Sequence, residues 1–224
     1  MHLELPHVPL KSLKDFLKHY LMIVLSILTA LGLEAWIERT HHIHAAEFGS
    51  RQIEAEVHSN LLAVESDLQN DTKQLERLDK IRASVAQDFK SHLPDEVIKQ
   101  HILAQVNDKF DLNMTFPALR HEAWDVAVAN QSASWIDPER MQRYSAAYAS
   151  QRDALATMAE NATLLTSSTN LSDVIADLRT GDVQPREFLH TVSQMTALQQ
   201  QTVNSLKILE KQLNDALTAK PGAV

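Results

Sequence analysis

The sequence contains no cysteine, and only four of its 224 residues are glycine. Without cysteine the chain has no disulfide, no thiolate nucleophile and no cysteine ligand for a metal ion. Sheets joined by tight turns use glycine and proline freely, so four glycines and seven widely spaced prolines favour long helices instead. We therefore predict an all-α fold.

Positive charge is also in short supply, because the formal net charge is −8. A surface this acidic repels phosphate backbones, so we expect no nucleic-acid partner. The sequence has no glycine-rich phosphate loop, no G-x-S-x-G and no H-E-x-x-H. We therefore predict that the protein is not an enzyme and carries no cofactor.

One apolar run stands out, "FLKHYLMIVLSILTALGLEAWI" over residues 16–37. It is long enough to cross a bilayer, which needs ~20 residues, if Lys18 reaches outward and Trp36 lies in the opposite headgroup layer. The alternatives are a cleaved signal peptide and a buried core helix. The first lacks small residues placed for cleavage, and the second would have to bury almost every face. We predict a transmembrane helix over 16–37 after a short cytoplasmic tail, 1–15.

Basic residues flank this span unequally. Lys11, Lys14 and Lys18 precede or begin it, whereas only Arg39 and Arg51 follow closely. This small excess favours a cytoplasmic N-terminus. Residues 38–224 would then lie outside the cytoplasm; in a bacterium the expected localisation is the inner membrane, with this part of the chain in the periplasm. The expected partners are the lipid bilayer and other membrane or envelope proteins, self-association included.

The span ends in "LGLEAWIERTHHIH", where acidic residues and histidines follow an apolar helix. Two turns of an α-helix take about seven residues, so one polar stripe forms here and small residues continue it into the membrane. The candidates for a membrane or oligomer face on this stripe are Ser26, Ala30, Glu34 and Glu38. His41 and His44, three residues apart, are the candidate metal ligands. One helix directs two ligands to a point and a closed zinc site needs four, so we predict a polar collar without metal.

Beyond the collar, apolar residues recur at alternating spacings of four and three, which is typical of a heptad seam. Gly49 lies within the predicted stalk helix and weakens it, because a glycine inside a helix lowers helix stability by ~1 kcal/mol relative to alanine. The first seam, in a stalk helix over 38–93, comprises Val57, Leu61, Val64, Leu68, Asp71, Leu75, Leu78, Arg82, Val85 and Phe89. The second, in a C-terminal helix over 185–219, comprises Phe188, Val192, Met195, Gln199, Thr202, Leu206, Leu209, Leu213 and Ala216. Neither helix can bury its stripe alone, so we expect the two to pack together in an elongated, coiled-coil-like outer domain.

Shorter helices are expected in the central segment, 94–184. The prolines and capping residues predict helices over about 94–109 and 117–130, a long helix after the N-cap Asp137, and another after the N-cap Asn170 that stops at Gly181. Residues 108–116 are expected to form a loop, and 220–224 a frayed tail. The aromatic candidates for a ligand pocket are Trp124, Trp135, Tyr144 and Tyr148. Aromatic rings at helical spacing beside alanines more often fill a core.

Two stretches, "IVLSILTALGLEAWIE" and "FPALRHEAWDVAVANQSASWIDPERMQRYSAAYASQ", resemble a family of bacterial single-pass membrane proteins of unknown function. The matching positions are Gly32, Leu33, Glu34, Trp36, Pro117, Ala123, Trp124, Ala127, Asp137, Tyr144, Tyr148 and Gln151. The resemblance implies an N-terminal span and a helical domain outside the cytoplasm. It implies no chemical activity.

Two functions fit these patterns. The first is a structural or partner-binding membrane protein, such as a scaffold or an accessory subunit of an envelope complex. The alternative is a sensor-like bundle that binds a small ligand between its helices and acts through a membrane partner. A polar pocket around Trp124 and Tyr148 would favour the sensor, whereas an exposed apolar strip on the stalk would favour partner binding.

Overall fold

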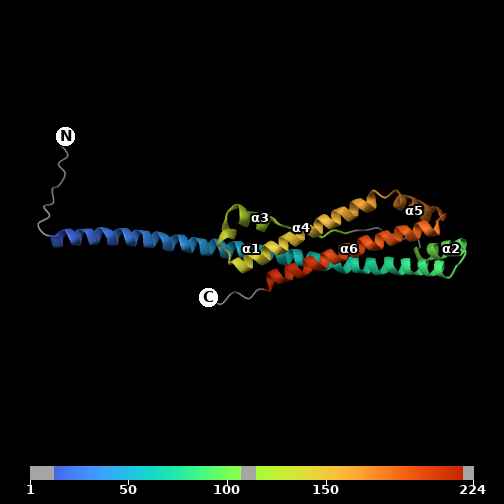
Figure 1. Cartoon of the computed structure of the whole chain (residues 1–224), viewed down its shortest axis with the longest axis horizontal. Coiled ribbons are helices and arrows are strands. Elements are labelled where there is room, and N and C mark those ends of the chain that lie inside the picture. Colours follow the sequence, from blue (N-terminus) through green and yellow to red (C-terminus); the bar gives the residue numbers. More distant parts are fainter. Residues whose placement is uncertain (1–12, 107–114, 219–224) are drawn as a thin grey trace, which may run out of the picture.

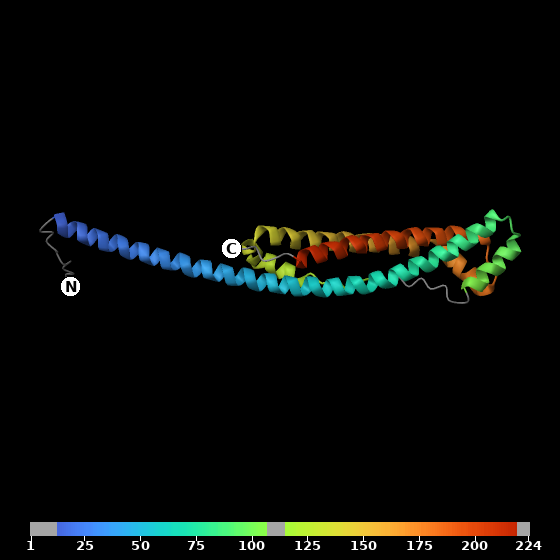
Figure 2. The same cartoon turned by 90° about the horizontal axis from the view of Figure 1, so that it is seen from below.

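The computed structural model describes residues 13–106 and 115–218, and within them the chain is helical with no β-strand. The prediction of an all-α fold is therefore confirmed. The elements are α1 (Leu13–Lys90), α2 (Asp95–Val106), α3 (Glu122–Ala129), the 3-10 helix η1 (Ser132–Trp135), α4 (Pro138–Thr166), α5 (Thr169–Thr180) and α6 (Pro185–Leu217). The first half of α1 projects alone, and its second half joins α4 and α6 in an elongated bundle (Figures 1 and 2).

The projecting part of α1 contains the apolar run. It is the one helix in the described residues that is long and apolar enough to cross a membrane, and none of its side chains there is buried. Residues 16–37 extend ~33 Å at 1.5 Å per residue, which matches a hydrocarbon core of ~30 Å. The hydroxyls of Ser26 and Thr29 donate to the carbonyls of Met22 and Leu25, at 2.8 and 2.7 Å. Because both bonds stay within the helix, neither hydroxyl needs water.

The bundle consists of α1, α4 and α6, and its hydrogen bonds fix their directions. Gln199 of α6 donates to the carbonyl of Asp71, and the cluster nearest the apolar run joins residues 53–64 of α1 to residues 206–216 of α6. These two helices therefore run antiparallel. Helix α4 runs parallel to α1, because Tyr144 reaches Glu54 while the later Gln151 is bonded by Asn60. The sequence had left these directions open.

The seam on α6 is as predicted, and all nine of its residues are buried. The seam on α1 is correct only in part, since Leu68, Leu75, Arg82 and Phe89 are half-buried. Arg82 instead pairs with Asp79 at 2.6 Å, while Ile81 takes the buried position. A straight α-helix drifts by ~20° per heptad from a strict seven-residue pattern, so the buried stripe of α1 leaves the predicted seam.

Two predicted helix starts are wrong. Residues 115–121 are not helical, and α3 begins at Glu122 rather than near Pro117. The cause is tertiary, because side chains of α1 and α4 bind the backbone just before α3, as described below. Helix α5 begins at Thr169 with Ser168 as its N-cap, so Asn170 lies inside the helix.

Other predicted boundaries are correct. Asp137 caps α4 by accepting a hydrogen bond from the backbone N–H of Arg140 at 3.0 Å. Gly181 ends α5 in the left-handed conformation, with φ +73°. Pro185 is the first residue of α6. Most of the predicted tail 1–15, the end of the helix predicted over 94–109, most of the loop predicted over 108–116, and the tail 220–224 lie outside the described residues.

Candidate functional site

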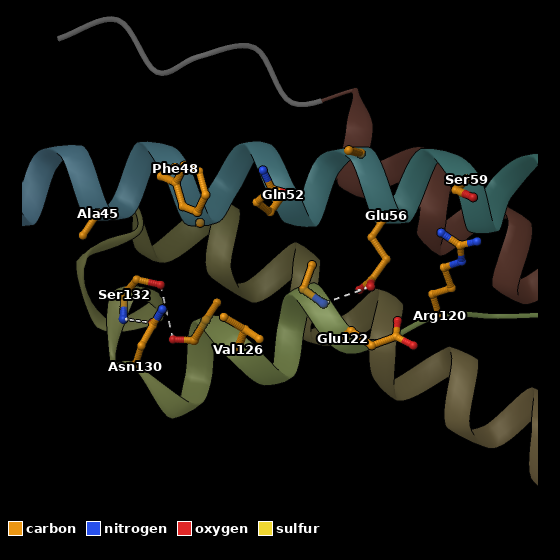
Figure 3. A pocket seen from close by; sticks show the side chains of 14 residues that line it. Ala45, Phe48, Gln52, Glu56, Ser59, Arg120, Glu122, Val126, Asn130 and Ser132 are labelled. Carbon is orange, nitrogen blue, oxygen red and sulfur yellow. Dashed lines mark hydrogen bonds between the residues drawn. The ribbon is translucent and has the colours of Figure 1, made fainter.

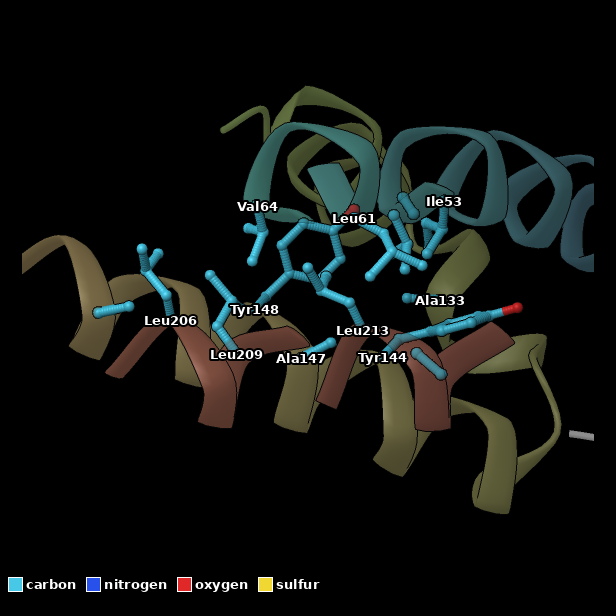
Figure 4. Close-up of a cluster of buried hydrophobic side chains, with 14 of the residues drawn as sticks. Ile53, Leu61, Val64, Ala133, Tyr144, Ala147, Tyr148, Leu206, Leu209 and Leu213 are labelled. Carbon is cyan, nitrogen blue, oxygen red and sulfur yellow. The ribbon is translucent and has the colours of Figure 1, made fainter. Parts of the chain in front are cut away.

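Two buried tyrosines join α4 to α1 at the end of the bundle nearest the apolar run 16–37. Tyr144 is fully buried and its hydroxyl donates to Glu54 at 2.7 Å, while Tyr148 donates to Glu56 at 2.5 Å. Burial raises the pKa of both phenols, and the carboxylate acceptors raise it further. Both hydroxyls therefore remain protonated and serve as donors. The rings fill the core between α1 and α6 (Figure 4).

The four aromatic pocket candidates do not form one pocket. Trp124 is half-buried and stacks on Tyr148, with ring centroids 5.0 Å apart. Trp135 lies apart from them in η1, is 51% exposed, and stacks on His42 with centroids 3.5 Å apart. Three of the candidates therefore belong to the packed interior or its edge, and the fourth belongs to the surface beside α1.

Asn60 organises the chain that leads into α3. Its side-chain amide donates to the Arg120 carbonyl at 2.7 Å and to Gln151 at 3.0 Å, and its oxygen accepts from the Arg120 backbone N–H at 2.9 Å. Gln151 also donates to the same carbonyl at 2.9 Å. One turn earlier, Glu56 accepts from the backbone N–H of Ala123 at 2.9 Å. Side chains from α1 and α4 thus hold residues 120–123 in place.

This arrangement leaves a groove of about 850 Å³ between α1 and α3 (Figure 3). Helix α3 runs antiparallel to α1, because its start lies beside Glu56 and the chain just after it reaches Gly49. The lining residues are Ala45, Phe48, Gly49, Gln52, Ala55, Glu56, Ser59, Arg120, Glu122, Ala123, Val126, Ala127, Asn130 and Ser132. The groove is therefore an open surface feature at the point where α1 leaves the bundle.

Gly49 permits the close approach that shapes one end of this groove. A Cβ atom at this position would lie 2.9 Å from the Ser132 hydroxyl oxygen, which is too close for any ordinary contact. Gly49 and Ser132 are both buried, so η1 packs directly on the backbone of α1. The glycine that weakens a long helix thus has a packing role here.

The walls of the groove are largely apolar and its far end is charged. Phe48 and Val126 are each 58% exposed. Glu56 already uses both carboxylate oxygens, on Tyr148 and Ala123, whereas Arg120 and Glu122 are exposed. Such a surface can bind apolar side chains and orient them by charge at one end.

An exposed histidine–aspartate hydrogen bond lies just outside the groove. His121 bonds Asp125 through Nδ1 at 2.7 Å, and this hydrogen bond raises the pKa of the histidine. The backbone N–H groups at the start of α3 lower the pKa of Glu122. Arg120 and Glu122 therefore place one positive and one negative charge at this end of the groove.

The collar residues are placed on the projecting part of α1. Glu34, Glu38, His41 and His44 are exposed, as are Ser26 and Ala30. In residues 13–106 and 115–218, no group of three or more His, Cys, Asp or Glu side chains is arranged to hold a metal ion. His42 differs from its neighbours because Trp135 covers its ring.

Comparison of the chain with known protein families, with curated proteins and with solved structures gives no match.

Sequence reasoning missed Glu56, Asn60 and the groove. The sequence did contain a signal for Asn60. Ile53, Val57, Asn60 and Val64 are also spaced by four, three and four residues, so they lie along one helix face that shares Val57 and Val64 with the predicted seam. Asn60 is the one polar residue among them. All four are buried. No comparable signal marked the groove, which depends on where the non-helical segment 115–121 returns to α1.

Proposed function

We propose that this chain is a single-pass protein of a bacterial inner membrane, with its N-terminus in the cytoplasm and its bundle in the periplasm. The apolar run of α1 and the lysines before it support this arrangement. Its role is to bind another membrane or envelope protein, as a scaffold or accessory subunit, rather than to catalyse a reaction.

The groove between α1 and α3 is the observation that carries this proposal. It extends from Ala45 to Ser59 along α1, which is ~21 Å, or about four turns of a helix. Exposed apolar side chains such as Phe48 and Val126 are typical of protein-binding surfaces. An amphipathic helix laid in a groove is a common recognition mode and fits these dimensions.

The distance of the groove from the proposed membrane span indicates what kind of protein supplies that helix. Ala45 lies eight residues beyond Ile37, or ~12 Å outside the apolar run. A helix that leaves the bilayer beside α1 therefore reaches the groove without a long linker. We infer a juxtamembrane helix of a second membrane protein, with apolar residues toward Phe48 and Val126 and polar residues toward Arg120.

The groove also supports the second candidate function, a sensor-like module for a small ligand. Its volume of about 850 Å³ falls within the usual range for small-molecule sites, ~300–1,000 Å³. The packed interior around Tyr144 and Tyr148 offers no comparable support, because its rings and hydroxyls are already used. We prefer the protein partner because the exposed apolar walls follow the stalk.

Photo-crosslinking in the native host tests this choice. A photoreactive phenylalanine analogue replaces Phe48 or Val126 in the groove, and Leu62 or Ile208 as controls, since both controls are exposed apolar residues outside its lining. We expect the same protein adduct from both groove positions and from neither control.

A charge placed in the groove provides the specificity control. Phe48→Glu should abolish the adduct formed from position 126, because it places a carboxylate against the apolar face of the partner helix. Adducts that are equal at all four positions, or absent from both groove positions, would contradict the proposal. A small-mass adduct without a protein would instead favour the ligand-binding alternative.

A further inference from the structure

Trp135 occupies an unusual position for a large apolar side chain. It ends η1, is 51% exposed, and lies flat on His42 with an interplanar angle of 9°. This tryptophan comes from the bundle, yet it contacts the part of α1 that has already left the bundle. It covers a notch of about 400 Å³ whose other lining residues are Ala35, Glu38, Arg39, His42 and Ile43.

The notch lies at the level of the membrane surface if residues 16–37 span the bilayer. Ala35 belongs to the end of the span, and Ile43 is only six residues beyond Ile37, or ~9 Å along the helix. Headgroup layers extend roughly 5–8 Å beyond the hydrocarbon core on each side, so most of the notch lies within one. Trp36, which is also exposed, lies at the same level. Tryptophan is enriched at this depth because its ring is apolar and its N–H is polar.

The chemistry of the notch matches a phospholipid headgroup. Arg39 and Glu38 both line it and both are exposed, so they present one positive and one negative charge. A zwitterionic headgroup carries a phosphate and an ammonium in the same close succession. Arginine binds phosphate through its fork of N–H donors, and the faces of aromatic rings attract ammonium groups.

We propose that Trp135 and the Ala35–Ile43 stretch of α1 form a seat for a zwitterionic phospholipid headgroup of the membrane that α1 crosses. The proposal rests on the proposed membrane span. The seat gives the bundle a second contact with the bilayer, beside the helix that anchors it. Helix α1 then cannot tilt freely at the membrane surface, and the groove is held at a fixed height.

Depth-dependent fluorescence quenching tests the seat in the full chain, reconstituted in phosphatidylcholine vesicles. The chain has three tryptophans, so three variants that each keep one of them, with the other two replaced by phenylalanine, report on single positions. The quencher is a phosphatidylcholine with a nitroxide on its headgroup. We expect Trp36 and Trp135 to lose most of their fluorescence, and Trp124, which packs on Tyr148 inside the domain, to keep it.

A spin label avoids any loss of folding caused by the tryptophan substitutions. Because the chain has no cysteine, Ser134→Cys places one label beside Trp135, and Ile208→Cys places a control label on an exposed part of α6. The label at 134 should be shielded from a water-soluble nickel complex, whereas the label at 208 should not. If Trp36 is quenched while Trp135 behaves like Trp124 and the label at 134 behaves like the label at 208, the headgroup seat is refuted but the membrane span is not. If Trp36 is also unquenched, the span itself is wrong.

Discussion

Replacing Asn60 by alanine should loosen the whole groove, because one side chain connects three parts of the molecule. Its three hydrogen bonds join α1 to both backbone groups of Arg120 and to Gln151 of α4, over distances of 2.7–3.0 Å. Asn60 is 1% exposed, so little water replaces these bonds after truncation. The Arg120 N–H and the Gln151 side-chain oxygen then lose the partner that they have in the folded chain.

The expected loss of unfolding free energy follows from the number of hydrogen bonds removed. Each net hydrogen bond contributes ~0.5–1.5 kcal/mol, so the free energy of unfolding should fall by about 2–4 kcal/mol. For a domain of this size the melting temperature should fall by roughly 4–16 °C. Because the lost bonds hold residues 120–123, the effect should also be local, and trypsin should cut after Arg120 sooner than in the unmodified protein.

The assay is chemical denaturation of the detergent-solubilised full chain, followed by circular dichroism, together with timed trypsin digestion. Asn70→Ala is the matched control, since it removes an exposed asparagine from the same helix. If Asn60→Ala costs less than ~0.5 kcal/mol, like a surface substitution, then the network does not hold α3 against α1 and the reasoning is refuted.

Further substitutions test the packing of the bundle by the same denaturation assay. Leu209→Ala should cost about 2–5 kcal/mol because Leu209 is fully buried, and Leu75→Ala should cost clearly less because Leu75 is half-buried; equal losses would contradict the burial pattern. Gly49→Ala should bring none of the usual gain of ~1 kcal/mol unless Ser132→Ala removes the hydroxyl that the new Cβ would meet. If Gly49→Ala alone raises the free energy of unfolding, the close approach of Ser132 to Gly49 is refuted. Burial raises the pKa of Asp71, and its Oδ2 has no partner among the described residues, so Asp71→Asn should stabilise by ~1–3 kcal/mol at neutral pH. Because folded Asp71 holds its proton more tightly than the unfolded chain does, the stability of the unmodified protein falls as pH rises from about 3.8 through the raised pKa. The stability advantage of Asp71→Asn should therefore vanish when the pH is lowered to about 3.8. A gain that does not depend on pH would exclude the buried carboxylate as its cause.

The two seams show how far the sequence alone could predict the fold. The line from Phe188 to Ala216 was predicted in full, because α6 lies against both of its neighbours and buries a broad stripe that contains the seam. On α1 the heptad pattern failed at Leu75 and Arg82, since the 3.6-residue period of an α-helix drifts away from a seven-residue repeat over a helix of this length.

The groove shows where sequence reasoning stopped. Proline at 117 suggested a helix start, yet the backbone at Arg120 is bonded by side chains 60 residues earlier and 31 residues later in the chain. Local propensity contains no information about such distant partners. The pairing of Trp135 with His42 was equally invisible, because it depends on how η1 packs against Gly49.

We propose that α1 is a single helix that first crosses the membrane and then enters the bundle outside the cytoplasm. Accessibility of single cysteines in intact spheroplasts tests it directly, because the chain has no cysteine of its own. A membrane-impermeant maleimide should label Ser66→Cys, an exposed position in the bundle, before lysis. It should label Lys14→Cys only after lysis, and Ala30→Cys only after detergent is added. Labelling of Lys14→Cys but not Ser66→Cys before lysis would reverse the topology, and free labelling of Ala30→Cys in intact membranes would show that α1 does not span the bilayer.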